Sequence, residues 1–115
     1  MAEWLASCER FLIYAQERQL VLPGHKLPFY GSEPRLQQLI ENHHGALRRL
    51  EAFLAEPHTA GESFRTIFKR DISGGEYGLA LVEAMAHCVH LWHAGRVTRT
   101  RRDDGALLWQ MREDV

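Results

Sequence analysis

The hydrophobic positions of this chain form helical stripes that are separated by short, turn-rich segments. Between residues 2 and 18, apolar side chains recur at helical intervals and predict an amphipathic helix carrying Trp4, Leu5, Cys8, Phe11, Leu12 and Ala15. The apolar run Leu20–Leu22 then predicts a short strand. A connection rich in proline and glycine follows, and it ends at a typical helix start, Ser32 or Glu33 before Pro34, because proline suits the first helical turn.

Two long helices and a short one are predicted in the remainder of the chain. The first long helix closes at Pro57 and has a narrow apolar seam made of Leu36, Ile40, His43, Leu47, Leu50 and Leu54. The pattern Thr59-x-x-Glu62 is a capping box, and it predicts a short helix with an inner face of Phe64, Ile67 and Phe68. The second long helix runs from about 76 to 94, stops at Gly95, and is expected to bury Tyr77, Leu81, Met85, Cys88 and Trp92.

The C-terminal segment has the pattern of a β-hairpin. Two β-prone runs, Val97–Thr100 and Ala106–Trp109, flank a turn that contains Asp104-Gly105. The order of helix, short helix, helix and hairpin is that of a winged helix. The sequence therefore predicts a mainly α fold with a small β-hairpin, in which the connection near residues 26–33 separates a helix-strand piece from a winged helix.

Composition indicates an ordinary globular domain. The chain has 115 residues, 45% of them hydrophobic, with a formal net charge of −1, so any polyanion partner requires a local basic patch. Charged residues interrupt the N-terminal helix, which excludes a signal-peptide core and a membrane span there. Cys8 and Cys88 lie in separate apolar stripes without metal-site spacing and predict buried thiols of a cytoplasmic protein.

The whole pattern resembles the C-terminal end of a metallo-β-lactamase-fold hydrolase that carries an appended winged helix. In the first half, the resemblance rests on Leu22-Pro23-Gly24-His25, Pro28-Phe29, Gly31, Arg35, Leu39, His43-His44 and Arg49-Leu50. In the second half it rests on Glu83-Ala84, Ala86-His87, His90-Leu91, Gly95-Arg96-Val97 and the hairpin. Two features depart from the family: its His-x-His-x-Asp-His motif is absent, and Lys26 follows the histidine where glycine is usual.

The resemblance implies a division of the chain and a metal role for one residue. Residues 1–30 correspond to the last helix and strand of the metallo-β-lactamase-fold domain, and residues 31–115 correspond to the winged helix. His25 matches the last metal ligand of the family and would bind the second of two zinc ions. Since one imidazole cannot hold zinc tightly, we expect the zinc to require an upstream catalytic domain, and this chain alone to be inactive.

Other candidate metal or catalytic residues are explained more simply. Glu83, His87 and His90 lie on one face of the second long helix and could share a metal, but the favoured interpretation is a polar helix face that a neighbouring helix or solvent covers. His43 lies on the apolar seam of its helix, which favours a hydrogen-bonded core histidine. Ser7 and Ser63 have no base at a suggestive spacing.

Two alternatives from other functional classes remain open. A nucleic-acid-binding winged helix would use a hairpin patch of Arg96, Arg99, Arg101 and Arg102. However, residues 71–95 contain no Lys or Arg for base recognition, and the outer, exposed face predicted for the second long helix presents Leu79, Glu83, His87 and His90. We therefore favour a solvated hairpin in which these arginines offset nearby acids, and nucleic acid is not the expected partner. A protein-interaction module could instead form a homodimer through an exposed Trp4/Phe11 stripe.

Overall fold

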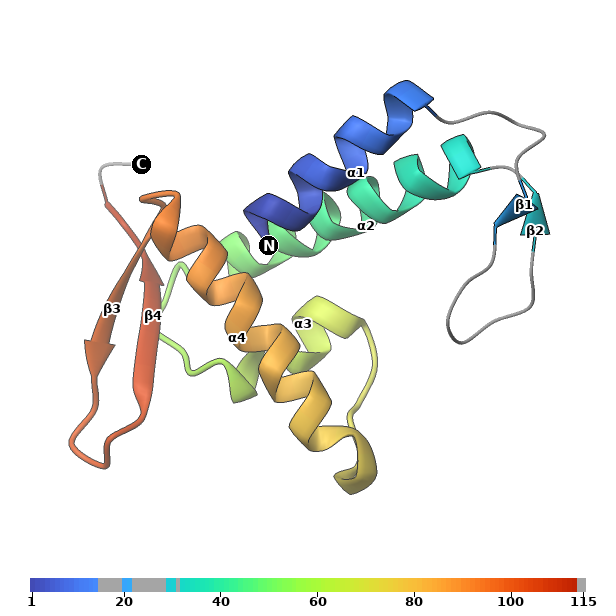
Figure 1. Cartoon of the computed structure of the whole chain (residues 1–115). Helices are drawn as coiled ribbons and strands as arrows, with labels where there is room; N and C mark the ends of the chain where they lie inside the picture. Colours follow the sequence, from blue (N-terminus) through green and yellow to red (C-terminus); the bar gives the residue numbers. More distant parts are fainter. Residues whose placement is uncertain (15–19, 22–28, 31, 114–115) are drawn as a thin grey trace. The chain divides into compact units, whose positions relative to one another are not determined.

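The computed structural model describes residues 1–14, 20–21, 29–30 and 32–113, and it is mainly helical with two small antiparallel sheets (Figure 1). The chain forms two compact units, Met1–His44 and Gly45–Val115. Helix α2 (Ser32–Phe53) contributes residues to both units. Within the described part of the chain, no helix has the length and apolar character needed to cross a membrane.

The first unit contains one helix, a small sheet and the beginning of α2. Helix α1 (Ala2–Tyr14) confirms the predicted N-terminal helix over these residues, and it buries Leu5 and Cys8. Strand β1 (Leu20–Val21) lies within the predicted strand and pairs antiparallel with β2 (Phe29–Tyr30). The pattern of the sequence did not predict β2. His43 of α2 is half-buried, and its ring centroid lies 4.4 Å from that of Trp4.

The second unit begins with the end of α2. Leu47 and Leu50 of α2, and Leu54 directly after it, are buried as the seam predicted. Its further elements are η1 (Gly61–Ser63), α3 (Phe64–Phe68), η2 (Gly74–Glu76), α4 (Tyr77–His93), β3 (Val97–Arg101) and β4 (Leu107–Met111). The capping box is confirmed: the Thr59 amide donates to Glu62 Oε1 at 2.9 Å, and the Glu62 amide donates to Thr59 Oγ1 at 3.3 Å. Phe64 and Ile67 are buried on the inner face of α3.

Helix α4 occupies the predicted range but presents a different face to the core. The residues that it buries are Ala80, Ala84, His87, Cys88 and Leu91. The predicted burial of Tyr77 and Trp92 is wrong, because both rings are exposed, and Leu81 and Met85 are only half-buried. Small alanines on the inner face allow α4 to approach α3 and β3, so close packing selects this face over the one with larger apolar side chains.

The C-terminal hairpin confirms the predicted Asp-Gly turn. Gly95 (φ +74°) ends α4 in the left-handed conformation, and Gly105 (φ +91°) occupies the same region in the hairpin turn. Trp109 of β4 is fully buried. Backbone hydrogen bonds also join Trp109 to His58, so that the segment between α2 and α3 adds a one-residue bridge beside the hairpin.

Candidate functional site

The predicted metal ligand, His25, lies outside the described residues, as does its neighbour Lys26. Its role as a zinc ligand therefore stays a prediction. Among the residues that the structure does describe, no group of three or more His, Cys, Asp or Glu side chains could hold a metal ion. The described side chains thus do not supply a zinc site, and no catalytic step is assigned to them.

Of the three residues of α4 that could have shared a metal, Glu83 is exposed, His87 is buried and His90 is half-buried. His87 is 4% exposed, and its Nδ1–H donates to the backbone carbonyl of Glu83 at 2.6 Å, whereas the Glu83 side chain is exposed. The interpretation that His87 belongs to the exposed face of this helix is therefore wrong. Burial lowers the pKa of His87, the hydrogen bond to the Glu83 carbonyl partly opposes this shift, and the nearby His90 and Arg49 add to the lowering. A neutral, inward imidazole is a structural group.

Both cysteines are buried and free, as predicted. Burial raises the pKa of Cys88 to about 12, and it also raises the pKa of Cys8, with a further contribution from Glu9. Since the thiolate is the nucleophilic and metal-binding form, neither thiol is prepared for catalysis at neutral pH. They are packing residues.

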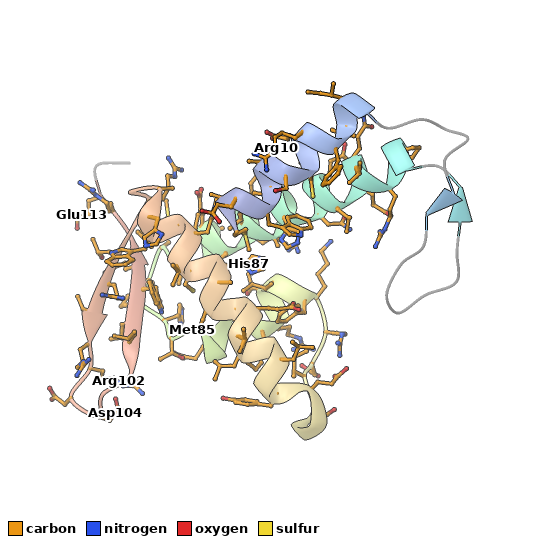
Figure 2. All side chains as sticks on the ribbon, viewed as in Figure 1. Arg10, Met85, His87, Arg102, Asp104 and Glu113 are labelled. Carbon is orange, nitrogen blue, oxygen red and sulfur yellow. The ribbon has the colours of Figure 1, made fainter. Side chains whose placement is uncertain are left out.

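The hairpin arginines are mostly engaged within the protein. Arg96 forms a bidentate pair with Glu51 (3.0 and 3.1 Å), and Arg102 forms another with Asp104 at the tip of the hairpin (3.0 and 2.8 Å; Figure 2). The hydrogen bonds from Arg102 hold the pKa of Asp104 at about 2. Arg99 lies over the ring of Trp92 at 4.0 Å. This arrangement agrees with a solvated hairpin whose arginines offset nearby acids.

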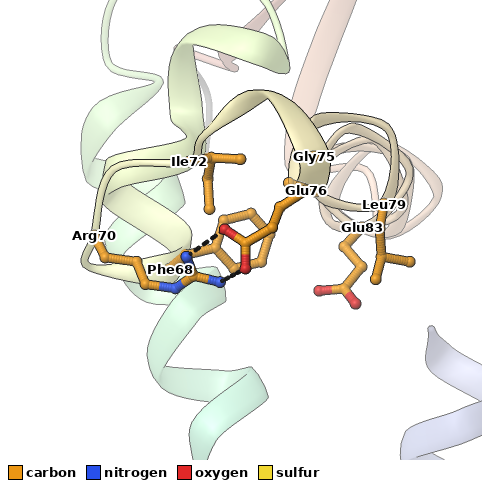
Figure 3. Close-up of a pocket in the computed structure, with 8 residues that line it drawn as sticks. Phe68, Arg70, Ile72, Gly75, Glu76, Leu79 and Glu83 are labelled. Atoms are coloured by element: carbon orange, nitrogen blue, oxygen red, sulfur yellow. Dashed lines mark hydrogen bonds and ion pairs between the residues drawn. The ribbon is translucent and has the colours of Figure 1, made fainter.

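A shallow pocket of about 220 Å³ opens beside the N-terminal half of α4 (Figure 3). The lining residues are Phe68 of α3, Arg70 and Ile72 of the following turn, Gly75 and Glu76 of η2, and Leu79, Ala80 and Glu83 of α4. Figure 3 shows Phe68 and Ile72 across from Leu79. Sequence reasoning missed this pocket because α3, the following turn and α4 each contribute only a few of its residues. The only local signal was the apolar Leu79 on a predicted outer face of the helix.

Comparison with known proteins places the chain in a family. A family model described as metallo-beta-lactamase-like, C-terminal domain, matches residues 47–112, and the chain belongs to this family. These residues span the end of α2 through the hairpin, which is nearly all of the described second unit. No curated protein matches the chain.

Two solved structures are similar to almost the whole chain. A beta-lactamase domain protein from Burkholderia ambifaria is 32% identical over 96% of the chain, with a TM-score of 0.87. A metallo-beta-lactamase family protein from Thermus thermophilus is 25% identical over 96% of the chain, with a TM-score of 0.76. The chain spans only 33% of each of those chains, so it corresponds to the C-terminal part of a metallo-β-lactamase-like protein.

Proposed function

We propose that this chain is the C-terminal portion of a zinc-dependent hydrolase of the metallo-β-lactamase superfamily, and that it is not catalytic by itself. In this proposal, residues 1–30 complete the upstream catalytic domain. Residues 31–115 form a winged helix that shapes or covers the substrate entrance. The observation that carries the proposal is the family match over residues 47–112, together with the length of the similar structures.

The element order of the second unit supports the winged-helix assignment. Helix α2 is followed by the one-residue bridge at His58, the short helix α3, the longer helix α4 and the β3–β4 hairpin. His58, between α2 and α3, pairs with Trp109 of β4 and so extends the β3–β4 sheet by one bridge. Because fold alone does not define chemistry, the hydrolase assignment rests on the family and not on this topology.

The zinc part of the proposal is tested by metal binding. When bound, zinc would activate a hydroxide for attack on a carbonyl or phosphoryl centre, and His25 would be one of its ligands. The 115-residue chain is titrated with zinc by calorimetry, and we expect no stoichiometric tight site, because one imidazole is too few ligands. A tight site that His25→Ala abolishes would refute the view that the other ligands lie upstream.

A chimera tests the role of His25 directly. The C-terminal third of the Burkholderia ambifaria protein is replaced by this chain, and bound zinc is measured by mass spectrometry. His25→Ala should lower the zinc content, whereas the control His44→Ala, which alters an exposed histidine of α2, should leave it unchanged. Equal zinc content in all three chimeras would exclude His25 as a ligand.

The same chimera tests the entrance role of residues 31–115. Removing this segment should leave zinc content intact while changing KM for bulky esters, thioesters or phosphodiesters more than for small ones. A binding surface outside the reacting centre alters KM without removing the catalytic groups. Unchanged KM across the panel would show that the segment does not shape the entrance.

One observation favours an additional interaction through α1. Trp4 and Phe11 are exposed large apolar side chains seven residues apart, which places them on one face of this helix. We propose that the upstream domain covers this face in the complete protein, and that the isolated chain forms a homodimer through it. Analytical ultracentrifugation should show a dimer that Phe11→Ser weakens, and a monomeric parent chain would contradict the homodimer.

A further inference from the structure

The pocket beside α4 belongs to a larger apolar surface of the second unit. Leu79 lines the pocket and is 70% exposed, and Val82, one helical turn further along, is 67% exposed. Phe68 and Ile72 provide the opposite apolar wall (Figure 3). Exposed large apolar side chains that adjoin a hollow are typical of a surface that another molecule covers.

The charges around this pocket leave one carboxylate uncompensated. Arg70 donates to both Glu76 oxygens at 2.8 and 3.2 Å, so these two charges neutralise each other at the rim. Asp71, near the rim, pairs with Arg65 at 3.5 Å. The exposed Glu83 carboxylate has no hydrogen bond or ion pair with any described residue, and residues 71–95 contain no Lys or Arg. Glu83 therefore offers a negative charge at the end of an apolar hollow.

The shape of the pocket favours a protein over a small molecule, and its charge disfavours nucleic acid. Pockets for small molecules usually enclose about 300–1,000 Å³ and surround most of the ligand. This pocket is smaller, at about 220 Å³, and continues onto the open face of α4 at Val82. The one basic side chain that lines the pocket, Arg70, is paired with Glu76, so the remaining charge is the carboxylate of Glu83, which would repel a phosphate backbone.

We propose that this pocket is the docking site of a protein segment that presents a large apolar side chain close to a Lys or Arg. The apolar side chain would lie between Phe68 and Leu79, and the cation would pair with Glu83. Because Leu79 and Glu83 are four residues apart on a helix, the two groups of the partner should be separated by about 6 Å. This inference does not depend on the hydrolase proposal, since all its residues lie in the second unit.

Selection from a random peptide library tests the proposal on the 115-residue chain. Immobilised chain should enrich peptides in which a large apolar residue lies near a Lys or Arg. The Leu79→Asp chain should lose this enrichment, and the Glu83→Lys chain should reverse the charge preference toward Asp and Glu. Glu56→Lys, the same charge change at an exposed position of the α2–α3 connection, should retain the preference of the parent chain.

Affinities of one selected peptide make the test quantitative. Leu79→Asp should weaken its binding more than about tenfold, because a charge replaces the apolar wall. Glu83→Gln should weaken it only about two- to fivefold, as expected for a solvent-exposed ion pair. Circular dichroism first establishes that each variant is folded, which these exposed positions permit. The proposal would be overturned by any of three results: no peptide is enriched, the Leu79→Asp chain binds as well as the parent chain, or the Glu83→Lys chain keeps the charge preference of the parent chain.

Discussion

Arg49 is expected to stabilise the contact between α2 and α3 through two hydrogen bonds. Its Nε donates to the Thr66 carbonyl at 2.9 Å, and its Nη2 donates to the Ile67 carbonyl at 3.0 Å. These are carbonyls of the last turn of α3 (Phe64–Phe68), where a helix has no internal donors left for its C=O groups. The half-buried guanidinium therefore satisfies two helix-end carbonyls and adds a favourable positive charge at that end.

The cost of losing this interaction follows from the two hydrogen bonds. A hydrogen bond to a charged group contributes about 1.5–3 kcal/mol, and partial exposure places each of these at the lower end of that range. We expect Arg49→Ala to lower the free energy of unfolding by about 2–4 kcal/mol. Arg49→Lys should cost about half as much, because an ammonium cannot reproduce the planar fork that reaches both carbonyls.

Urea unfolding followed by tryptophan fluorescence measures this effect. All chains carry Trp4→Phe, so that the signal comes only from Trp92 and Trp109 of the second unit. The matched control is Arg48→Ala, since Arg48 is the exposed neighbour on the same helix and should change stability by less than about 0.5 kcal/mol. If Arg48→Ala and Arg49→Ala destabilise the chain equally, the capping role of Arg49 is wrong.

Three further predictions concern backbone conformation, a buried titratable group and the capping box. Gly95→Ala should destabilise the chain by about 1 kcal/mol, because the φ of +74° at Gly95 disfavours a Cβ. Gly78→Ala within α4 should instead stabilise the chain by about 0.5–1 kcal/mol, and thermal melts in which both substitutions shift stability in the same direction would contradict this. The folded-state pKa of His87 lies below its ordinary value of 6.5, so the stability that is present above pH 6.5 should be lost as the pH falls toward the folded-state pKa. The free energy of unfolding of the His87→Gln chain should lack this decrease, and identical pH profiles for the two chains would refute the lowered pKa of His87. Thr59→Ala should cost about 1 kcal/mol in urea unfolding, because the Glu62 amide loses its hydroxyl acceptor, and an unchanged midpoint would count against the cap.

Local signals in the sequence predicted local structure well. The Asp104-Gly105 turn and the Thr59–Glu62 capping box depend on neighbouring residues only, and both occur where the pattern indicated. The seam over Leu47, Leu50 and Leu54 was equally readable, because the intervening segment carries charged residues at Arg48, Arg49 and Glu51. In these segments, the polar positions left a single face available for the core.

Helix α4 shows why the same reasoning failed elsewhere. Its sequence is apolar on most sides, so that periodicity alone could not select the buried face. The face that packs is built from Ala80, Ala84 and Cys88, whose small side chains permit close approach, and it includes His87, whose ring is satisfied by its own helix backbone. Choosing this face requires knowledge of the partner elements, which lie up to dozens of residues away in the chain.

Pairing of charges limits what the hairpin and the pocket can bind, and composition could not show it. Arg96, which directly precedes β3, pairs with the Glu51 carboxylate of α2, 45 residues earlier in the chain. An arginine that the sequence placed in a basic patch is therefore part of an ion pair in the folded protein. After Arg70 is likewise matched with Glu76, the exposed face of α4 retains the negative charge of Glu83 beside Leu79. A nearly neutral chain thus presents an acidic, apolar surface on α4 where a DNA-binding helix would need basic residues. The proposed protein contact therefore fits this surface better than base recognition, which uses Arg, Lys, Asn or Gln side chains.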